Sequence, residues 1–381
     1  MKEFDNQLTY LTIDLSALEH NIKAIKGQLS KSTSYMSVIK ADGYGHGAIQ
    51  VAKTAIASGA DFLVVARLEE AIMLRQNGIN APILLLGTLL IYDVILAAKN
   101  SITISVNGYG QALLINEILK GKGLNLDLHI KIDSGMGRLG LLLNDSSLTN
   151  QSLISEIEDI NSLSNLRVTG LYSHFATADE EDSNFAKEQL SKFSKLVSAL
   201  KERGYNSLLY HCANSAALFT LKESHFNAVR CGLIQYGLYP FEGFDKKFIS
   251  LKPVLSWYST IVHIKKVPKD FCVSYGCSAK TNRESLLATV GVGYGDGYSR
   301  ALSNCGYMLV NGQRAPIVGR VCMDLTIIDV TGIDCMVGDK VVLIGTSGGL
   351  TITADDIARA TNTISYEVVS TICKRVPRFY K

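Results

Sequence analysis

The chain has 381 residues, of which 47% are hydrophobic and 19% charged, and its formal net charge is +3. This composition is typical of a globular protein with enough apolar material for a core. The small and evenly spread charge excludes a basic arm for nucleic acid and a polybasic membrane anchor. We therefore expect small polar or charged metabolites as partners, with no nucleic acid and no membrane.

The first residues lack the basic-then-apolar pattern of a signal peptide. The most apolar stretch, residues 81–98, contains Pro82, Gly87 and Asp93. A membrane span needs about 20 clean apolar residues, so this stretch predicts a short strand followed by a helix. We expect a cytoplasmic protein.

Eight cysteines are present, and no two of them have CxxC spacing or lie at metal-ligand intervals with histidines. This spacing does not predict a zinc site or any other metal site. We expect most of the cysteines to be small buried residues of a reduced cytosolic protein.

Short apolar runs alternate with amphipathic helical patterns from residue 36 to about residue 240. The eight runs are 36–40, 62–66, 83–87, 102–106, 128–133, 168–174, 208–213 and 229–233. Near-continuous apolar strands separated by helices predict βαβ units and a parallel sheet. Eight such strands favour an α/β fold, a closed (β/α)8 TIM-type barrel over residues 1–244, and an open doubly wound sheet is the main alternative.

The pattern changes at about residue 245, where β-rich segments follow one another between turn signals. Asn311-Gly312 predicts a tight hairpin, because both residues accept positive φ. Only the tail from Ala354 onward returns to a helical pattern. Residues 245–381 are therefore expected to form a mostly antiparallel β domain.

Polar side chains follow five of the eight predicted barrel strands, at the carboxyl ends where barrel enzymes keep their chemistry. These residues are Lys40, Tyr44, His46, Arg138, His174, Asn214, Ser215 and Arg230, and the eighth strand also carries Gly232 and Leu233. Taken singly, a lysine that ends a strand is usually a solvated charge, and a histidine there is usually a loop or core residue. Their coincidence at one end of one barrel instead indicates a site for a charged ligand.

The loops after the seventh and eighth strands, ANSAA and CGLIQYG, resemble phosphate-binding loops of barrel enzymes. A hydroxyl opens a helix in the first loop, and a glycine permits close backbone approach in the second. A phosphate site near Lys40 suggests a phosphorylated aldehyde cofactor that the lysine holds covalently.

Nine motifs, in order, resemble those of the alanine racemase family. They are VIKADGYGHGA, HIKIDSGMGRLG, GLYSHFATADE, HCANSAA, VRCGLIQYGLYP, VSYGC, VGYGDGY, VGRVCMD and TISYEV, and they span residues 38 to 368. The resemblance implies pyridoxal 5'-phosphate as cofactor, L- and D-alanine as substrate and product, and a head-to-tail homodimer with active sites at the interface. It also implies a supply of D-alanine for bacterial cell-wall peptidoglycan.

Residue by residue, the resemblance implies that Lys40 holds the cofactor and acts as acid or base on one face of the substrate. Tyr275 would serve the opposite face from the other subunit. The residues implied to hold the phosphate are Tyr44, Ser215, Gly232, Leu233 and Tyr366. Arg230 would meet the pyridine nitrogen, with His174 beside it, and Arg138 would hold the substrate carboxylate.

Four more residues match family positions in the motifs. Met323 would contribute its backbone to substrate binding across the interface, with Asp324 beside it, and Tyr294 would line the entrance. Lys131 matches a lysine that is often carbamylated, although an ordinary strand lysine is an equal alternative. Two departures from the family, Gly43 for alanine and Leu233 for isoleucine, remove no functional atom, but Gly43 is expected to loosen the loop that carries Lys40.

Three alternatives remain open. A serine or broad-specificity racemase would use the same scaffold, although the bulk of Tyr366 favours alanine. A decarboxylase of this plan would need an acidic group in place of Arg230. A cofactor carrier would resemble only the first 240 residues and would not need Tyr275.

Overall fold

The computed structural model describes residues 6–144, 147–180 and 183–381. Within these, the chain forms two compact units. The first, here called the barrel unit, consists of Leu18–Gly43 and Ala48–Lys252. The second, here called the β unit, consists of the N-terminal stretch through Ala17, Tyr44–Gly47 and Pro253–Lys381.

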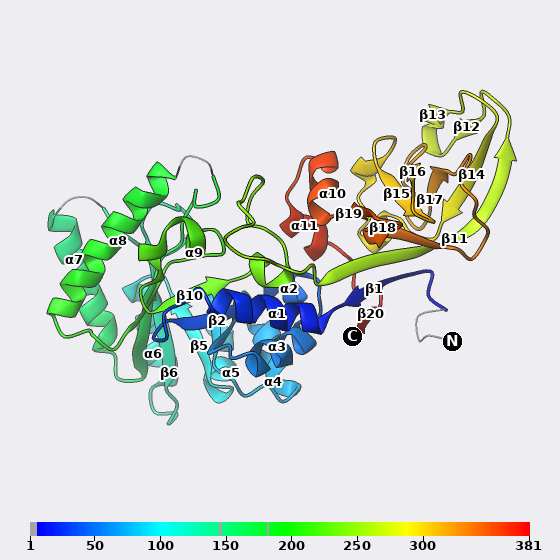
Figure 1. Cartoon of the computed structure of the whole chain (residues 1–381). Coiled ribbons are helices and arrows are strands. Elements are labelled where there is room, and N and C mark those ends of the chain that lie inside the picture. The colour runs from blue at the N-terminus through cyan, green and yellow to red at the C-terminus, as the bar shows by residue number, and fades with distance from the viewer. Residues whose placement is uncertain (1–5, 145–146, 181–182) are drawn as a thin grey trace. The chain divides into compact units, whose positions relative to one another are not determined.

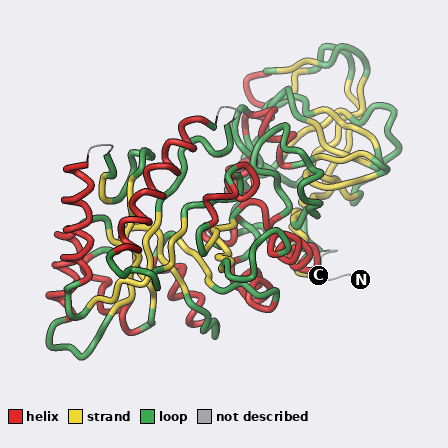
Figure 2. The backbone as a smooth tube through the Cα atoms, turned by 60° about the vertical axis from the view of Figure 1, so that its left-hand side comes forward, coloured by secondary structure: helices red, strands yellow, loops and turns green. Residues whose placement is uncertain are grey.

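Eight parallel strands form a closed sheet in the barrel unit. Figure 2 shows these strands in yellow with helices in red around them. The strands are β2 (Ser34–Val38), β3 (Phe62–Val65), β4 (Ile83–Thr88), β5 (Ile102–Val106), β6 (Leu126–Asp133), β8 (Leu166–Tyr172), β9 (Leu209–His211) and β10 (Ala228–Cys231). The pairings β5–β6 and β10–β2 close the ring, so the barrel prediction is confirmed and the open-sheet alternative is wrong. A short strand, β7 (Leu141–Leu142), extends β6.

Helices connect the barrel strands and cover the sheet (Figure 1). They are α1 (Leu15–Lys26), α3 (Ala48–Ala57), α4 (Leu68–Gln76), α5 (Val94–Lys99), α6 (Tyr109–Leu119), α7 (Ser147–Asn161), α8 (Asn184–Glu202) and α9 (Ala217–Thr220). The sheet is covered on its outside and packed with side chains inside, which explains the near-continuous apolar strands. The stretch 81–98 forms β4, the 3-10 turn η1 (Ile91–Asp93) and α5. No helix in the described part of the chain is long and apolar enough to cross a membrane.

The β unit is built around the long strand β11 (Leu255–Val267). It pairs antiparallel with β1 (Thr9–Ile13), β14 (Ser285–Val290) and β18 (Lys340–Ser347). The other strands are β12 (Cys272–Val273), β13 (Ala279–Lys280), β15 (Tyr307–Val310), β16 (Gln313–Pro316), β17 (Thr326–Asp329), β19 (Leu350–Ile352) and β20 (Arg378–Tyr380). The tail forms α10 (Ala354–Thr361) and α11 (Ser365–Ser370). The Asn311-Gly312 hairpin is confirmed, with φ of 48° and 80° between β15 and β16.

The N-terminal strand belongs to the β unit, whereas the sequence places residues 1–244 together. β1 lies between β11 and the C-terminal strand β20. Hydrogen bonds between the two ends of the chain cause this arrangement, and no local pattern signals them. Along the chain, the boundary between the barrel unit and the C-terminal part of the β unit lies between residues 252 and 253, whereas the sequence predicts it between residues 244 and 245.

The expectation of mostly buried cysteine thiols is wrong. Cys272 and Cys277 form a disulfide. Among the other cysteines, Cys212 and Cys231 are buried, while Cys305 and Cys373 are exposed. Spacing along the chain does not show which cysteines face solvent, because exposure depends on how the strands pack.

Candidate active site

Lys40 begins a left-handed turn that directly follows β2. The turn, α2 (Lys40–Tyr44), has φ near 52° at Ala41, 55° at Asp42 and 62° at Gly43. Two carboxylates hold it: Glu70 Oε1 accepts a hydrogen bond from the Ala41 N–H at 2.6 Å, and Asp42 Oδ1 accepts one from the Ala48 N–H at 2.9 Å. Left-handed backbone is costly for a residue with a Cβ atom. Gly43 therefore stabilises this turn, contrary to the expected loosening.

The electrostatic surroundings of Lys40 favour its neutral amine. Burial lowers the pKa of Lys40, and the nearby charges of Arg138 and Arg230 lower it further, while Glu70 opposes them. A neutral amine is the form that attacks an aldehyde or accepts a proton. Lys40, after the first barrel strand, is thus the candidate nucleophile and base of the barrel unit.

Arg230, in β10, is buried and makes hydrogen bonds through both terminal nitrogens. Nη1 donates to His211 Nδ1 at 2.7 Å and to the His211 carbonyl at 3.1 Å. Nη2 donates to His174 Nδ1 at 3.0 Å and to the carbonyls of Ser173 at 2.8 Å and Cys212 at 3.1 Å. These contacts hold the guanidinium in a single position at the carboxyl ends of the strands.

The contacts of Arg230 also determine the tautomers of two histidines. Arginine only donates hydrogen bonds, so Nδ1 of both His211 and His174 must accept. His211 then carries its proton on Nε2, which lies 2.8 Å from His129 Nδ1 and donates to it. Burial, followed by the charge of Arg230, lowers the pKa of His174 and of His211 well below the usual value. Both rings are therefore neutral near pH 7.

Lys131 lies inside the barrel with 4% of its surface exposed. Among residues 6–144, 147–180 and 183–381, its Nζ has no hydrogen-bond partner, and it lies 4.8 Å from the centre of the Tyr172 ring. Burial, aided by Arg230 and Arg138, lowers the pKa of Lys131 to about 7. An amine without a partner and with a lowered pKa is open to reaction with carbon dioxide.

A tight turn after β6 carries Arg138 to an exposed position. The carboxylate of Asp133 accepts hydrogen bonds from the N–H groups of Gly135 at 3.0 Å, Met136 at 2.8 Å and Gly137 at 3.1 Å. Burial raises the pKa of Asp133, but these hydrogen bonds outweigh it and the net pKa is lowered. The turn places Arg138 after the carboxyl end of β6, where its charge lowers the pKa of Lys40 and of Lys131.

The two predicted phosphate loops meet in the barrel unit. The N–H of Gly232 donates to Ser215 Oγ at 3.2 Å. Asn214 Oδ1 accepts from the N–H groups of Ala216 at 3.1 Å and Ala217 at 2.9 Å. Because α9 has only 4 residues, its dipole is smaller than we expected from the sequence. In these contacts Ser215 Oγ only accepts, so its O–H is the candidate donor to a ligand here.

In the β unit, Tyr44 and Tyr366 lie with ring centres 6.1 Å apart. Burial raises the pKa of Tyr44, so its hydroxyl stays protonated and can donate a hydrogen bond. The loop after Tyr44 approaches the C-terminal segment closely, since a Cβ atom on Gly45 would lie 2.1 Å from the Val369 carbonyl oxygen. Glycine is required at this point.

The remaining predicted residues of the β unit are largely exposed: Tyr275 by 70%, Met323 by 54% and Tyr294 by 43%. Arg375 joins the segments that carry Met323 and Tyr294. Its Nε lies 2.7 Å from Asp296 Oδ1, and its Nη2 lies 2.8 Å from Asp324 Oδ1.

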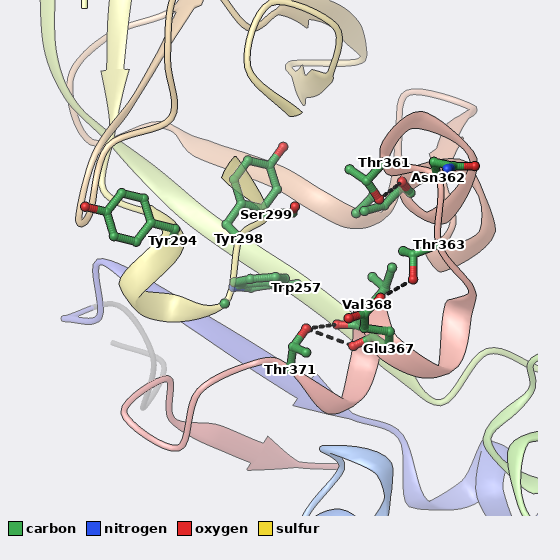
Figure 3. Close-up of a pocket in the computed structure, with 12 residues that line it drawn as sticks. Trp257, Tyr294, Tyr298, Ser299, Thr361, Asn362, Thr363, Glu367, Val368 and Thr371 are labelled. Atoms are coloured by element: carbon green, nitrogen blue, oxygen red, sulfur yellow. Dashed lines mark hydrogen bonds between the residues drawn. The ribbon is translucent and has the colours of Figure 1, made fainter. Parts of the chain in front are cut away.

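A cavity of about 500 Å³ also lies in the β unit. Figure 3 shows Tyr294 and Trp257 on one side of it, with Thr361 and Thr363 on the other. Glu367, near its floor, accepts a hydrogen bond from Thr363. Tyr294 is the only predicted site residue that lines this cavity. The cavity is therefore a candidate for part of the entrance and not for the catalytic centre.

The barrel unit thus brings together Lys40, Lys131, His174 and Arg230, which interact electrostatically. Sequence reasoning missed His211, which orients Arg230, and Glu70, which holds the Lys40 turn. The histidine of HCANSAA was a usable signal, because it lies in a strand whose end carries other predicted site residues. Glu70 had no signal, since its partner is a backbone N–H 29 positions away.

Comparison with known proteins covers both units. The alanine racemase N-terminal domain model matches residues 13–240, and the C-terminal domain model matches residues 254–380. An alanine racemase of Desulfosudis oleivorans is 42% identical over 371 residues, 97% of this chain and 95% of the relative. One from Halothermothrix orenii is 43% identical over 374 residues, 98% of this chain and 97% of the relative.

Solved structures agree with these matches. The alanine racemase of Clostridium difficile 630 has a TM-score of 0.91 and 38% identity, covering 98% of this chain and 96% of its own. The enzyme from Bartonella henselae, described with covalently bound pyridoxal phosphate, has a TM-score of 0.86 and 28% identity, covering 98% of this chain and 99% of its own.

Proposed function

Because the chain belongs to the alanine racemase family, we propose that it interconverts L-alanine and D-alanine with two opposed acid/base residues, Lys40 and Tyr275. Alanine racemisation with pyridoxal phosphate follows from membership of this family. The assignment of individual residues is our proposal. The observation that supports it is a lysine of lowered pKa near the buried Arg230, whose two terminal nitrogens are held by hydrogen bonds.

The residues of the barrel unit suit pyridoxal 5'-phosphate. Lys40 offers an amine of lowered pKa for the aldehyde, and Ser215 and Gly232 offer a hydroxyl and a backbone segment for the phosphate. Tyr44 and Tyr366 keep the phosphate-binding role that the resemblance implies, as does Leu233. When bound, the cofactor withdraws electrons from the α-carbon of the amino acid and so acidifies its proton.

Arg230 is suited to meet the pyridine nitrogen. The five hydrogen bonds above use Nη1 and Nη2, and Nε takes part in none of them. Arginine does not give up its proton, so the pyridine nitrogen would stay unprotonated and electron withdrawal would stay moderate. This favours return of the α-proton over transamination. It also argues against a decarboxylase.

Racemisation needs a proton to leave one face of the α-carbon and another to arrive at the opposite face. In our proposal the Lys40 amine holds or delivers the proton on one face, and the Tyr275 hydroxyl does so on the other. Arg138 binds the substrate carboxylate. His174, neutral and hydrogen-bonded to Arg230, keeps that guanidinium in place.

We infer that the enzyme works as a homodimer whose active sites lie at the interface. The exposure of Tyr275, Met323 and Tyr294 within their own chain supports a role in a neighbouring subunit's site. Met323 would contact the substrate through its backbone, and Tyr294 would narrow the entrance. A cytoplasmic location and a supply of D-alanine for peptidoglycan complete the proposal.

Lys131 is proposed to be carbamylated. Its buried amine without a partner would become an anion facing Arg138 and Arg230, which now repel it. Intact-protein mass spectrometry in bicarbonate should show added carbon dioxide on the wild type and none on a Lys131→Met variant. A wild type that carries no added mass in bicarbonate would leave Lys131 an ordinary lysine.

Borohydride reduction tests the proposal directly. The holoenzyme should carry cofactor fixed on the peptide that contains Lys40, and Lys40→Ala should carry none. Racemisation rates on L-alanine, L-serine and L-lysine then test specificity, because the bulk of Tyr366 favours alanine. Fixation at another lysine refutes the residue assignment, and equal rates on serine favour the broad-specificity alternative.

A further inference from the structure

The disulfide Cys272–Cys277 encloses Tyr275, the residue proposed above as the second acid/base group. The two cysteines are five positions apart, with Cα atoms 5.0 Å apart. They flank a short turn between β12 and β13 in the β unit (Figure 1). Only Val273, Ser274, Tyr275 and Gly276 lie between them.

The backbone inside this loop is unusual. Ser274, Gly276 and Cys277 all have positive φ, of 63°, 70° and 45°. Side-chain-bearing residues seldom adopt this conformation, and they keep it only where the surrounding structure constrains them strongly. The loop that aims Tyr275 therefore depends on its constraints.

The two arms of the loop are constrained differently. The first arm is anchored by Val273, which is buried against Val267 and Leu287, and by Ser274, whose Oγ donates to the Arg320 carbonyl at 2.6 Å. The second arm, from Tyr275 to Cys277, is exposed. The disulfide joins this exposed arm covalently to the anchored one.

The Tyr275 side chain is 70% exposed. Packing within its own chain therefore does little to set the direction of its ring, and the backbone of the loop must do so. Cys272 and Cys277 are also exposed, so a small dithiol can reach the bond in the isolated chain.

We propose that the Cys272–Cys277 disulfide positions Tyr275 and makes racemisation depend on thiol redox state. This inference rests on the proposed function. A dithiol reductant gives two electrons and two protons to the bond, so that the S–S bond breaks, two thiols form and the reductant becomes a disulfide. Hydrogen peroxide reverses the step, since two thiols and one peroxide give the disulfide and two waters.

The reduced loop keeps its first arm and loses the covalent link to its second. The hydrogen bond from the Cys277 N–H to the Ser274 carbonyl, at 3.2 Å, is then the remaining direct contact between the arms among the contacts described. Misplacing a catalytic group by about 1 Å can slow a reaction by up to roughly 10²-fold. We expect kcat to fall by roughly tenfold on reduction, while KM changes little because the proposed carboxylate ligand, Arg138, lies in the barrel unit.

The experiment equilibrates the holoenzyme with defined ratios of reduced and oxidised dithiol and measures kcat, KM and α-proton exchange of each alanine enantiomer. Alkylation and peptide mapping report the state of Cys272 and Cys277 in each sample. The double variant C272S/C277S should match the reduced enzyme and no longer respond to dithiol. The control C305S/C373S, which removes the two exposed free thiols, should respond as the wild type does.

The proposal predicts that kcat follows the alkylation state of Cys272 and Cys277 and that exchange slows for one enantiomer more than for the other. Equal activity in both states, or free thiols at both positions under all conditions, overturns the inference while leaving the racemase intact. Absence of racemisation in every state refutes the proposed function, and the inference with it.

Discussion

Replacing Lys131 by methionine should stabilise the protein, although the residue lies in the candidate site. In the folded chain its pKa is lowered from 10.5 to about 7, mainly by burial. The unfolded chain therefore binds more protons than the folded chain between about pH 7 and pH 10. Across this window the free energy of unfolding rises with pH, and below it the dependence on Lys131 is flat.

The size of the effect follows from the pKa. One pKa unit corresponds to about 1.36 kcal/mol, so a fall from 10.5 to about 7 corresponds to roughly 5 kcal/mol of destabilisation below pH 7. Methionine fills a similar volume without charge. Since relaxation around a buried charge reduces its cost, we expect Lys131→Met to raise the free energy of unfolding by about 2 to 4 kcal/mol at pH 7.

Urea unfolding between pH 6 and pH 10, in buffer free of carbon dioxide, measures this change. Lys201 is the matched control, because it also lies over a tyrosine ring, that of Tyr210 at 5.6 Å, but is exposed. Lys201→Met should change the free energy of unfolding by less than about 0.5 kcal/mol. Added bicarbonate should stabilise the wild type and leave Lys131→Met unchanged. A Lys131→Met variant that is less stable than the wild type at pH 7 without bicarbonate would refute the reasoning.

Three further predictions concern the loops of the site. Tyr275→Phe should slow racemisation at least about 10²-fold, while borohydride still fixes the cofactor. The α-proton exchange measured by NMR should fail for one alanine enantiomer only, and equal loss for both would contradict the two-base scheme. Gly43→Ala should lower the free energy of unfolding by about 1 to 2 kcal/mol, because position 43 has a φ of +62°. It should also lower kcat, because the new Cβ would lie 3.3 Å from a Val51 methyl. Gly78→Ala, with a φ of +78° and open space around it, is the control, and an equal kcat for the two variants would refute a role of Gly43 in aiming Lys40. Arg375→Lys should raise KM for alanine several-fold, because one ammonium cannot reproduce the two directed contacts of the guanidinium; an unchanged KM would show that these contacts do not support the substrate site.

Much of the barrel was predictable because local pattern and tertiary environment agree there. The eight strands are covered on both faces, so each one is a continuous apolar run that the sequence shows directly. Polar residues at the strand ends interrupt those runs, which is why Lys40, Arg138, His174 and Arg230 were found. The Asn311-Gly312 hairpin was predictable for a similar reason, since its backbone conformation selects its residues.

Contacts between distant segments were not predictable in this way. β1 pairs with β11 and with the C-terminal strand β20 through hydrogen bonds between segments far apart in the chain. Backbone hydrogen bonds are nearly independent of residue type, so they leave no motif. The same holds for Glu70, whose carboxylate holds the Lys40 turn by accepting a backbone N–H.

The sequence by itself determined the eight barrel strands, the order of the barrel and the β domain along the chain, and the residues at the strand ends. It could do so because periodicity and residue type are local properties. Only the tertiary structure decided the chemical state of those residues. The lowered pKa of Lys131, the tautomers imposed by Arg230 and the disulfide around Tyr275 all depend on distances between side chains. Burial and charge act through space, so a pKa or a hydrogen-bond donor is known only once the neighbours are in place.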